Sequence, residues 1–194
     1  MTGMKPMKRF YYRAYQTVFD LGSRVIPWRK PEIVSGAGST AKIPELLRGC
    51  GVKKVMIVSG KHTGAVLVPP IRAQIEAAGI SAVHFDGVRA NPTISIIEQV
   101  RERYLAEGCD GLLAVGGGSP MDTAKAAAAR IVRPNRTVEQ MTGLFKVMHA
   151  LPPFIAVPTT AGSGSETTIA AVITNEITHP RHARMDLCLV PRFA

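Results

Sequence analysis

The stretch AVGGGSPMDTAKAAAA, Ala114 to Ala129, joins an apolar run to an alanine-rich one through three glycines and a serine. The first run predicts a buried strand and the second a helix. We expect Ser119 to be the N-cap of that helix, Pro120 its first residue and Asp122 the acid of a capping box. Glycines leave backbone N–H groups uncovered at the positive end of a helix, which favours a phosphate site. The structural alternative is a tight turn that merely needs glycine.

The glycine loop matches neither of the two common nucleotide-binding motifs. The G-x-G-x-x-G fingerprint requires glycine or alanine where Met121 stands, and an acid about 20 residues further on, where the sequence has Arg136. No G-K-[ST] follows the glycines, which excludes a P-loop. A nucleotide site at this loop therefore belongs to a different family.

Strands and helices alternate along the chain. Apolar runs predict strands at 53–60, 81–87, 110–118 and 152–160, and helical periodicity predicts helices after Pro70, from Thr93 to Gly108 and from Ser119 to Val132. Single helices between strands imply parallel crossovers, hence an α/β fold with a doubly wound sheet and helices on both faces. Two strand-like runs without a helix between them, 167–182 and 186–194, predict a β-hairpin extension. Ligands bind such sheets beyond the carboxyl ends of the strands, where the glycine-rich loops fall.

The composition of the chain limits the kinds of partner that it can bind. Its 194 residues, 46% apolar and 20% charged, suit one sizeable globular domain. The net charge of +10 prompts a search for anionic partners, but no basic block, RNA-binding aromatic motif or zinc-finger spacing supports nucleic-acid binding. Much of the positive charge lies in residues 1–30, which predict a basic amphipathic surface helix. A mitochondrial presequence or membrane-surface contact is the alternative for that segment.

The number of cysteines and the hydropathy of the chain indicate its location in the cell. Cys50, Cys109 and Cys188 are few and widely spaced, which suits a reducing compartment. No apolar stretch reaches the ~18 residues of a membrane span, and no secretory signal pattern precedes the domain. We therefore expect a cytoplasmic protein without membrane association.

A second loop, PTTAGSGSETT from Pro158 to Thr168, follows the last predicted strand of the sheet. Its hydroxyl and amide groups suit a polar cofactor that carries ribose and amide groups, although a solvated serine and glycine loop is the alternative. The loop does not match G-x-S-x-G, so a hydrolase nucleophile is not supported.

Together, GGGSPMDTAK at Gly116 to Lys125 and PTTAGSGSE at Pro158 to Glu166 resemble the iron-containing (group III) alcohol dehydrogenase family. The NPT at 91–93 and the AVIT at 171–174 match the same family, so the resemblance covers nearly all of residues 31–194. It implies that 31–194 form a Rossmann-like domain that binds NAD or NADP. It also implies that a following helical domain binds a divalent metal, iron or zinc.

The resemblance implies roles for the matched residues. The pyrophosphate would lie on the glycine loop, the nicotinamide side near the helix-start acid, and further contacts would come from the second loop and the NPT turn: Gly116, Gly117, Gly118, Ser119, Asp122, Thr159, Thr160, Ser163, Asn91 and Pro92. Ser163 stands where threonine is more usual, and keeps the hydroxyl.

The end of the first strand departs from the family pattern. Many members carry an aspartate there, which binds the adenosine ribose and repels a 2′-phosphate, whereas this chain has Ser59, Gly60 and Lys61. Loss of that negative charge and gain of a cation should admit NADP. We expect NADP to be used at least as well as NAD.

The resemblance implies that the metal ligands, one aspartate and three histidines, would follow Ala194. We therefore expect no catalytic or metal-binding residue in these 194 residues, and dinucleotide binding without turnover. His179 and His182 form an H-x-x-H pair, but Pro180 indicates a turn, which argues against a metal site there.

The implied function is NAD(P)-dependent, metal-assisted interconversion of small alcohols with aldehydes or ketones by a homo-oligomer. The alternatives are a glycerol or hydroxyacid dehydrogenase of the same superfamily, or a non-catalytic dinucleotide-binding or interaction module.

Overall fold

The structure is a computed structural model that describes residues 12–13, 16–17, 30–174 and 181–194. The predicted basic segment, residues 1–30, falls almost entirely outside these residues, and so do His179 and Pro180. Among the described residues, no helix has both the length and the hydropathy needed to cross a membrane.

Four parallel strands form the main sheet, in the order β2-β1-β3-β5. They are β1 (Lys54–Gly60), β2 (Ser81–Val88), β3 (Gly111–Gly116) and β5 (Phe154–Pro158). Each neighbouring pair is parallel. The four strands predicted from apolar runs are confirmed, with ends that differ by one or two residues.

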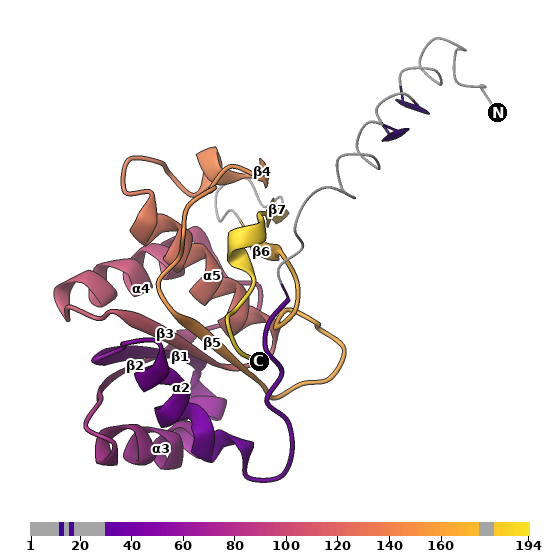
Figure 1. Ribbon diagram of the computed structural model, residues 1–194. Helices are drawn as coiled ribbons and strands as arrows, with labels where there is room; N and C mark the ends of the chain where they lie inside the picture. The colour runs from indigo at the N-terminus through magenta and orange to yellow at the C-terminus, as the bar shows by residue number, and fades with distance from the viewer. Residues whose placement is uncertain (1–11, 14–15, 18–29, 175–180) are drawn as a thin grey trace.

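Helices cover both faces of this sheet (Figure 1). On one face lie α2 (Ile43–Gly49) and α3 (Lys61–Ala77), and on the other lie α4 (Ile94–Ala106) and α5 (Gly118–Val132). Alternate side chains of β1 serve the two faces: Val55 and Ile57 pack with α2 and α3, whereas Met56 and Val58 pack with α4 and α5. A strand buried on both faces needs apolar side chains at every position, which explains the continuous apolar runs. The doubly wound α/β fold is confirmed.

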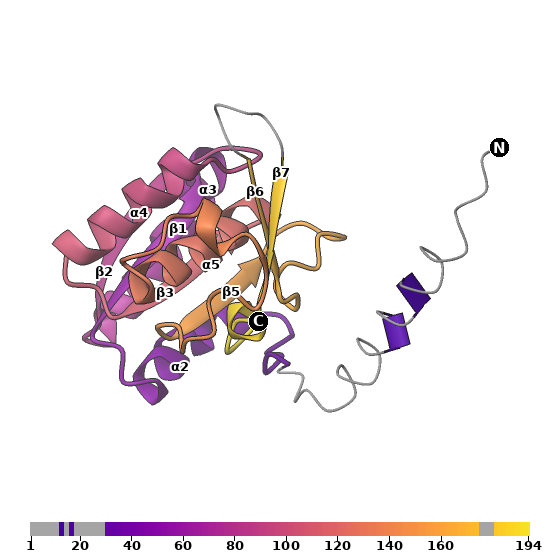
Figure 2. The ribbon, with the colours of Figure 1, turned by 90° about the horizontal axis from the view of Figure 1, so that it is seen from above.

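A second, small sheet extends the domain. In it β6 (Ala170–Thr174) pairs antiparallel with β7 (Arg181–Met185), and β4 (Gly143–Leu144) lies parallel to β7. Figure 2 shows β6 and β7 beyond the carboxyl end of β5. The predicted hairpin extension is confirmed, but its second strand was placed too late, at 186–194.

Asp186 explains why the chain turns instead of continuing as a strand. Its buried carboxylate accepts hydrogen bonds from the backbone N–H groups of Val147, Met148 and Cys188, and the 3-10 turn η3 (Leu187–Leu189) follows. The last residues then return to the main sheet.

The helix predicted after Pro70 begins ten residues earlier, at Lys61, and contains both Pro69 and Pro70. Proline removes a backbone N–H and usually ends a helix. Both prolines are exposed, as are the residues four positions before them, so water can satisfy the carbonyl groups that lose their partners. Gly60, at the end of β1, is therefore the N-cap of a long helix.

Candidate functional site

The predicted cofactor loops lie along one edge of the main sheet. Gly60 and Gly116 end the two central strands, and the register places Gly60 opposite Val88 of β2 and Gly116 opposite Pro158 of β5. The same register pairs Ser59 with Val115, so the ends of β1 and β3 are level. The carboxyl ends of all four strands thus meet at this edge.

Helix α5 begins directly after the glycines. Gly117 is its N-cap, in an extended conformation (φ −82°, ψ −160°), and no side chain caps the helix. The predictions of Ser119 as N-cap and of a capping box with Asp122 are therefore wrong. Gly116 has a φ of +148°, so the chain turns at the last strand residue and the helix starts two residues earlier than the serine indicates. The first N–H groups of a helix have no intrahelical acceptor and carry partial positive charge, which suits an anionic group.

The two predicted loops are in contact. A Cβ atom on Gly117 would lie 2.7 Å from Thr160 Oγ1, and one on Gly118 would lie 3.4 Å from Ser163 Cβ. The backbone N–H of Thr159 also donates to the carbonyl oxygen of Gly116, at 3.0 Å. Glycine at position 117 is thus needed for the close approach of Thr160, and the two loops form one surface of backbone and hydroxyl groups.

The end of β1 presents different residues inward and outward. Ser59 is fully buried, and its Oγ lies 2.8 Å from Nε2 of His84 on β2. Burial lowers the pKa of His84. A Cβ atom on Gly64 of α3 would lie 2.6 Å from Ser59 Oγ, so this helix packs directly on the pair. The Ser59 hydroxyl is thus engaged inside the fold, while Lys61 is exposed at the start of α3.

The NPT turn is attached to the hairpin. Asn91 is exposed, with a φ of +56°. The carbonyl oxygen of buried Pro92 accepts a hydrogen bond of 2.9 Å from the N–H of Thr174, at the end of β6. This contact fixes the turn after β2 close to the small sheet.

Asp122 joins α5 to the second loop instead of capping its own helix. Its Oδ1 accepts a hydrogen bond from Ser165 Oγ at 2.5 Å, and its Oδ2 accepts one from the N–H of Val172 at 3.0 Å. Burial raises the pKa of Asp122, and these two hydrogen bonds partly oppose that effect.

Lys125 is a residue of this region to which sequence reasoning assigned no role. It is fully buried, and its Nζ donates to the carbonyl oxygens of Ser165, Thr168 and Ala170 at 2.6, 2.8 and 2.9 Å. Burial lowers the pKa of Lys125 to about 8. The sequence did contain a signal, because a cation within an alanine-rich helix that is buried all round needs acceptors from another segment.

The proton of Lys125 makes stability depend on pH. Its pKa falls from 10.5 to about 8 on folding, so between these values the folded chain has released a proton that the unfolded chain keeps. The contribution of Lys125 to the free energy of unfolding therefore rises as the pH increases from about 8 toward 10.5. That contribution is lowest below pH 8. The measurement is the free energy of unfolding of the parent minus that of Lys125→Met, from about pH 7 to about pH 10. A difference that stays constant with pH would contradict this expectation.

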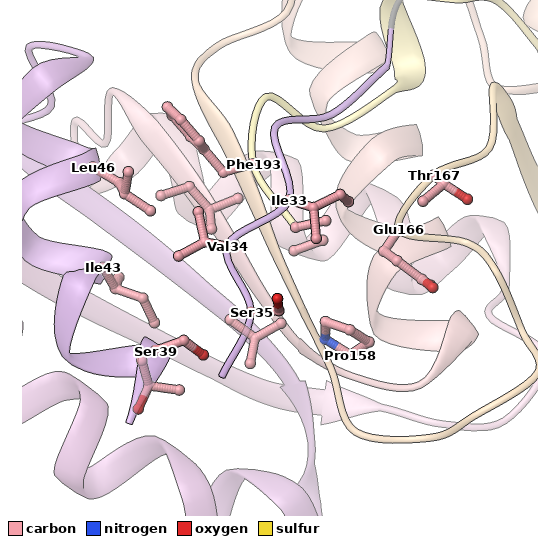
Figure 3. Close-up of a pocket in the computed structure, with 15 residues that line it drawn as sticks. Ile33, Val34, Ser35, Ser39, Ile43, Leu46, Pro158, Glu166, Thr167 and Phe193 are labelled. Atoms are coloured by element: carbon pink, nitrogen blue, oxygen red, sulfur yellow. The ribbon is translucent and has the colours of Figure 1, made fainter. Parts of the chain in front are cut away.

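A pocket of about 380 Å³ lies beside the second loop, at the edge strand β5. Ile33, Val34 and Phe193 line it together with Glu166 and Thr167 of the loop (Figure 3). The Oε2 atom of Glu166 is buried and has no hydrogen-bond partner among the described residues. No residue of 116–119 lines the pocket, so it is a feature separate from the glycine loop.

Comparison with known proteins identifies the family that this chain matches. A family model described as iron-containing alcohol dehydrogenase matches residues 30–194. A choline dehydrogenase of Bacillus subtilis is 38% identical over 148 residues, 74% of this chain and 37% of that protein. A NAD-dependent methanol dehydrogenase of Bacillus methanolicus is 30% identical over 165 residues, 84% of this chain and 43% of that protein. The structure of an alcohol dehydrogenase from Oenococcus oeni superposes with a TM-score of 0.82 at 34% identity, over 87% of this chain and 45% of that chain. The chain thus spans less than half of each relative.

Proposed function

Because the chain belongs to the iron-containing alcohol dehydrogenase family, we propose that it binds the dinucleotide cofactor of an NAD(P)-dependent oxidoreductase. The observation that carries this proposal is the contact between the two loops, where a Cβ atom on Gly117 would lie 2.7 Å from Thr160 Oγ1. Gly117 and Gly118 have no side chains to cover the backbone N–H groups at the start of α5, and the Thr160 hydroxyl lies beside them. The pyrophosphate would lie on Gly116 to Ser119, held by these N–H groups and the positive end of the helix.

The outer part of the same edge would bind the adenosine half of the cofactor. Gly60 caps α3 and carries no side chain, and exposed Lys61 follows it. A 2′-phosphate placed there would meet the start of a helix and a cation, and no carboxylate at position 60. We propose that NADP is used at least as well as NAD.

The reaction we propose is the interconversion of small alcohols with aldehydes or ketones, by a homo-oligomer. The nicotinamide ring supplies or accepts the hydride, and a divalent metal, iron or zinc, would polarise the substrate oxygen. The described residues do not fit that metal, because they contain no group of three or more His, Cys, Asp or Glu that could hold it. Its ligands would therefore lie outside the described residues, and the role of the described part is to bind and orient the cofactor.

Titration of the protein with NADPH and NADH, followed by the fluorescence of the reduced nicotinamide, tests the proposal. We expect saturable binding of both, with NADPH bound at least as tightly, and displacement by the oxidised form of each. Absence of saturable binding by either dinucleotide would refute cofactor binding and favour an interaction module. A strong preference for NADH would refute only the assignment of the 2′-phosphate site.

A further inference from the structure

We infer that Lys125 is a positioning residue for the second loop: its ammonium group holds residues 165–170 against α5 and so sets how closely Thr160 approaches Gly117. The inference rests on the proposed cofactor function, because the surface it positions is the one assigned to the dinucleotide.

The hydrogen bonds of Lys125 account for its whole donor capacity. An ammonium group has three N–H bonds. Three carbonyl oxygens surround Nζ, those of Ser165, Thr168 and Ala170, and Thr168 Oγ1 lies 3.2 Å away. The side chain is fully buried, so water does not compete for these acceptors. The Lys125 side chain thus binds three carbonyl groups of the six residues 165–170.

The second loop is hydrogen-bonded at both of its ends to the segment formed by the end of β3 and α5. At its start, the N–H of Thr159 donates to the carbonyl oxygen of Gly116, the last residue of β3. At its end, Lys125 and Asp122, both on α5, hold Ser165 through its carbonyl oxygen and its hydroxyl respectively. Between the two ends, Gly162 and Gly164 have φ values of +92° and +63°, and residues 159–163 are exposed. Because the middle is exposed, the clamped ends decide where Thr160 lies.

Removal of the ammonium should loosen the loop more than the fold. An apolar side chain at position 125 would fill the same volume in the core, but would leave the Ser165 and Thr168 carbonyl groups without the Lys125 donor and the Ala170 carbonyl with only the Thr168 hydroxyl, at 3.3 Å. Those carbonyls could regain partners only if residues 165–170 moved toward water. The main sheet has no hydrogen bond to Lys125, so its pairing does not depend on this residue.

The test uses Lys125→Met, which keeps the length of the side chain without donors, and Lys125→Gln, whose amide keeps two N–H donors. The matched control is Lys54→Met, since Lys54 lies at the start of β1 and pairs with Glu107, away from the loop. Two quantities are measured where circular dichroism shows folded protein: amide hydrogen exchange in 163–172 without ligand, and the dissociation constant for NADPH. We expect Lys125→Met to speed exchange in that segment and to weaken NADPH binding about tenfold. Lys125→Gln should restore part of both, and Lys54→Met should change neither.

The outcomes separate this inference from the proposed function. If Lys125→Met lowers the melting temperature but leaves loop exchange and NADPH affinity as in the parent, its role is structural only and the inference is overturned. If the parent binds neither dinucleotide, the proposed function fails, while loop exchange still decides whether Lys125 holds the segment. Should Lys125→Met not fold, Lys125→Gln decides by the same two measurements, with intermediate exchange supporting the inference and parental exchange overturning it.

Discussion

Gly117→Ala is expected to weaken the binding of NADPH and NADH by about tenfold or more, without a comparable loss of stability. The added Cβ atom would lie 2.7 Å from Thr160 Oγ1, closer than real Cβ contacts allow, so the Thr160 side chain must turn or the second loop must move away from the start of α5. The backbone at Gly117 has a φ of −82°, which alanine adopts without strain. Thr160 is exposed and can shift at little cost to the fold, so the effect should fall on the proposed cofactor surface.

Two variants make this measurement specific. Gly49→Ala is the matched control, because a Cβ atom there meets nothing within 4 Å, and its affinity for NADPH should equal that of the parent. In a Thr160→Ala background the atom that collides is absent, so Gly117→Ala should weaken binding less than it does alone. Equal affinities for Gly117→Ala and Gly49→Ala would show that the contact between the loops does not shape the binding surface.

Gly60→Asp is expected to shift the ratio of NADPH affinity to NADH affinity toward NADH by roughly 10- to 100-fold. The carboxylate would stand at the N-cap of α3, where it can accept hydrogen bonds from the ribose hydroxyls and repels a 2′-phosphate. Aspartate is a favoured N-cap residue, and Gly60 has an extended backbone (φ −82°, ψ 159°), so the variant should fold. The new Cβ atom would lie 3.2 Å from the carbonyl oxygen of Val88, a close contact that requires only a small adjustment.

Gly60→Asn separates the charge from the added volume, because its side chain has the same shape and no charge. It should leave the ratio of the two affinities near that of the parent. The ratio is obtained from dissociation constants measured in the same buffer for both dinucleotides. If Gly60→Asp and Gly60→Asn change the ratio of affinities equally, the change comes from the volume of the added side chain and not from its charge. That result would remove the argument for a 2′-phosphate at this strand end.

The resemblance drawn from the two loops is confirmed by the family match, and the doubly wound fold is confirmed by the sheet. Both predictions depended on patterns within short stretches of the sequence. Apolar runs mark the strands, and Gly60 and the glycines at 116–118 mark the strand ends, where the ligand site of such a sheet lies. The roles of the individual residues at these ends stay predictions, which the variants above test.

Local rules failed where a neighbouring segment overrode them. Ser119 and Pro120 follow the pattern of a helix start, yet α5 begins at Gly118 because the chain already turns at Gly116. Pro69 and Pro70 predict a helix boundary, yet α3 continues through them because their side of the helix faces water. The run after Asp186 reads as a strand, yet the Asp186 carboxylate accepts a hydrogen bond from the Cys188 N–H in the turn that follows and two more from Val147 and Met148 of a separate loop.

The sequence by itself determined the four strands of the main sheet, the edge of that sheet where the glycine-rich loops lie, and the family, because apolar periodicity and glycine placement act over a few residues. Only the tertiary structure decided that Gly117 makes room for Thr160, that Ser59 faces His84, and that Lys125 holds the second loop. The physical reason is distance along the chain. Lys125 and Ser165 are 40 residues apart, and a buried cation finds its acceptors only after the sheet has brought both segments to the same edge.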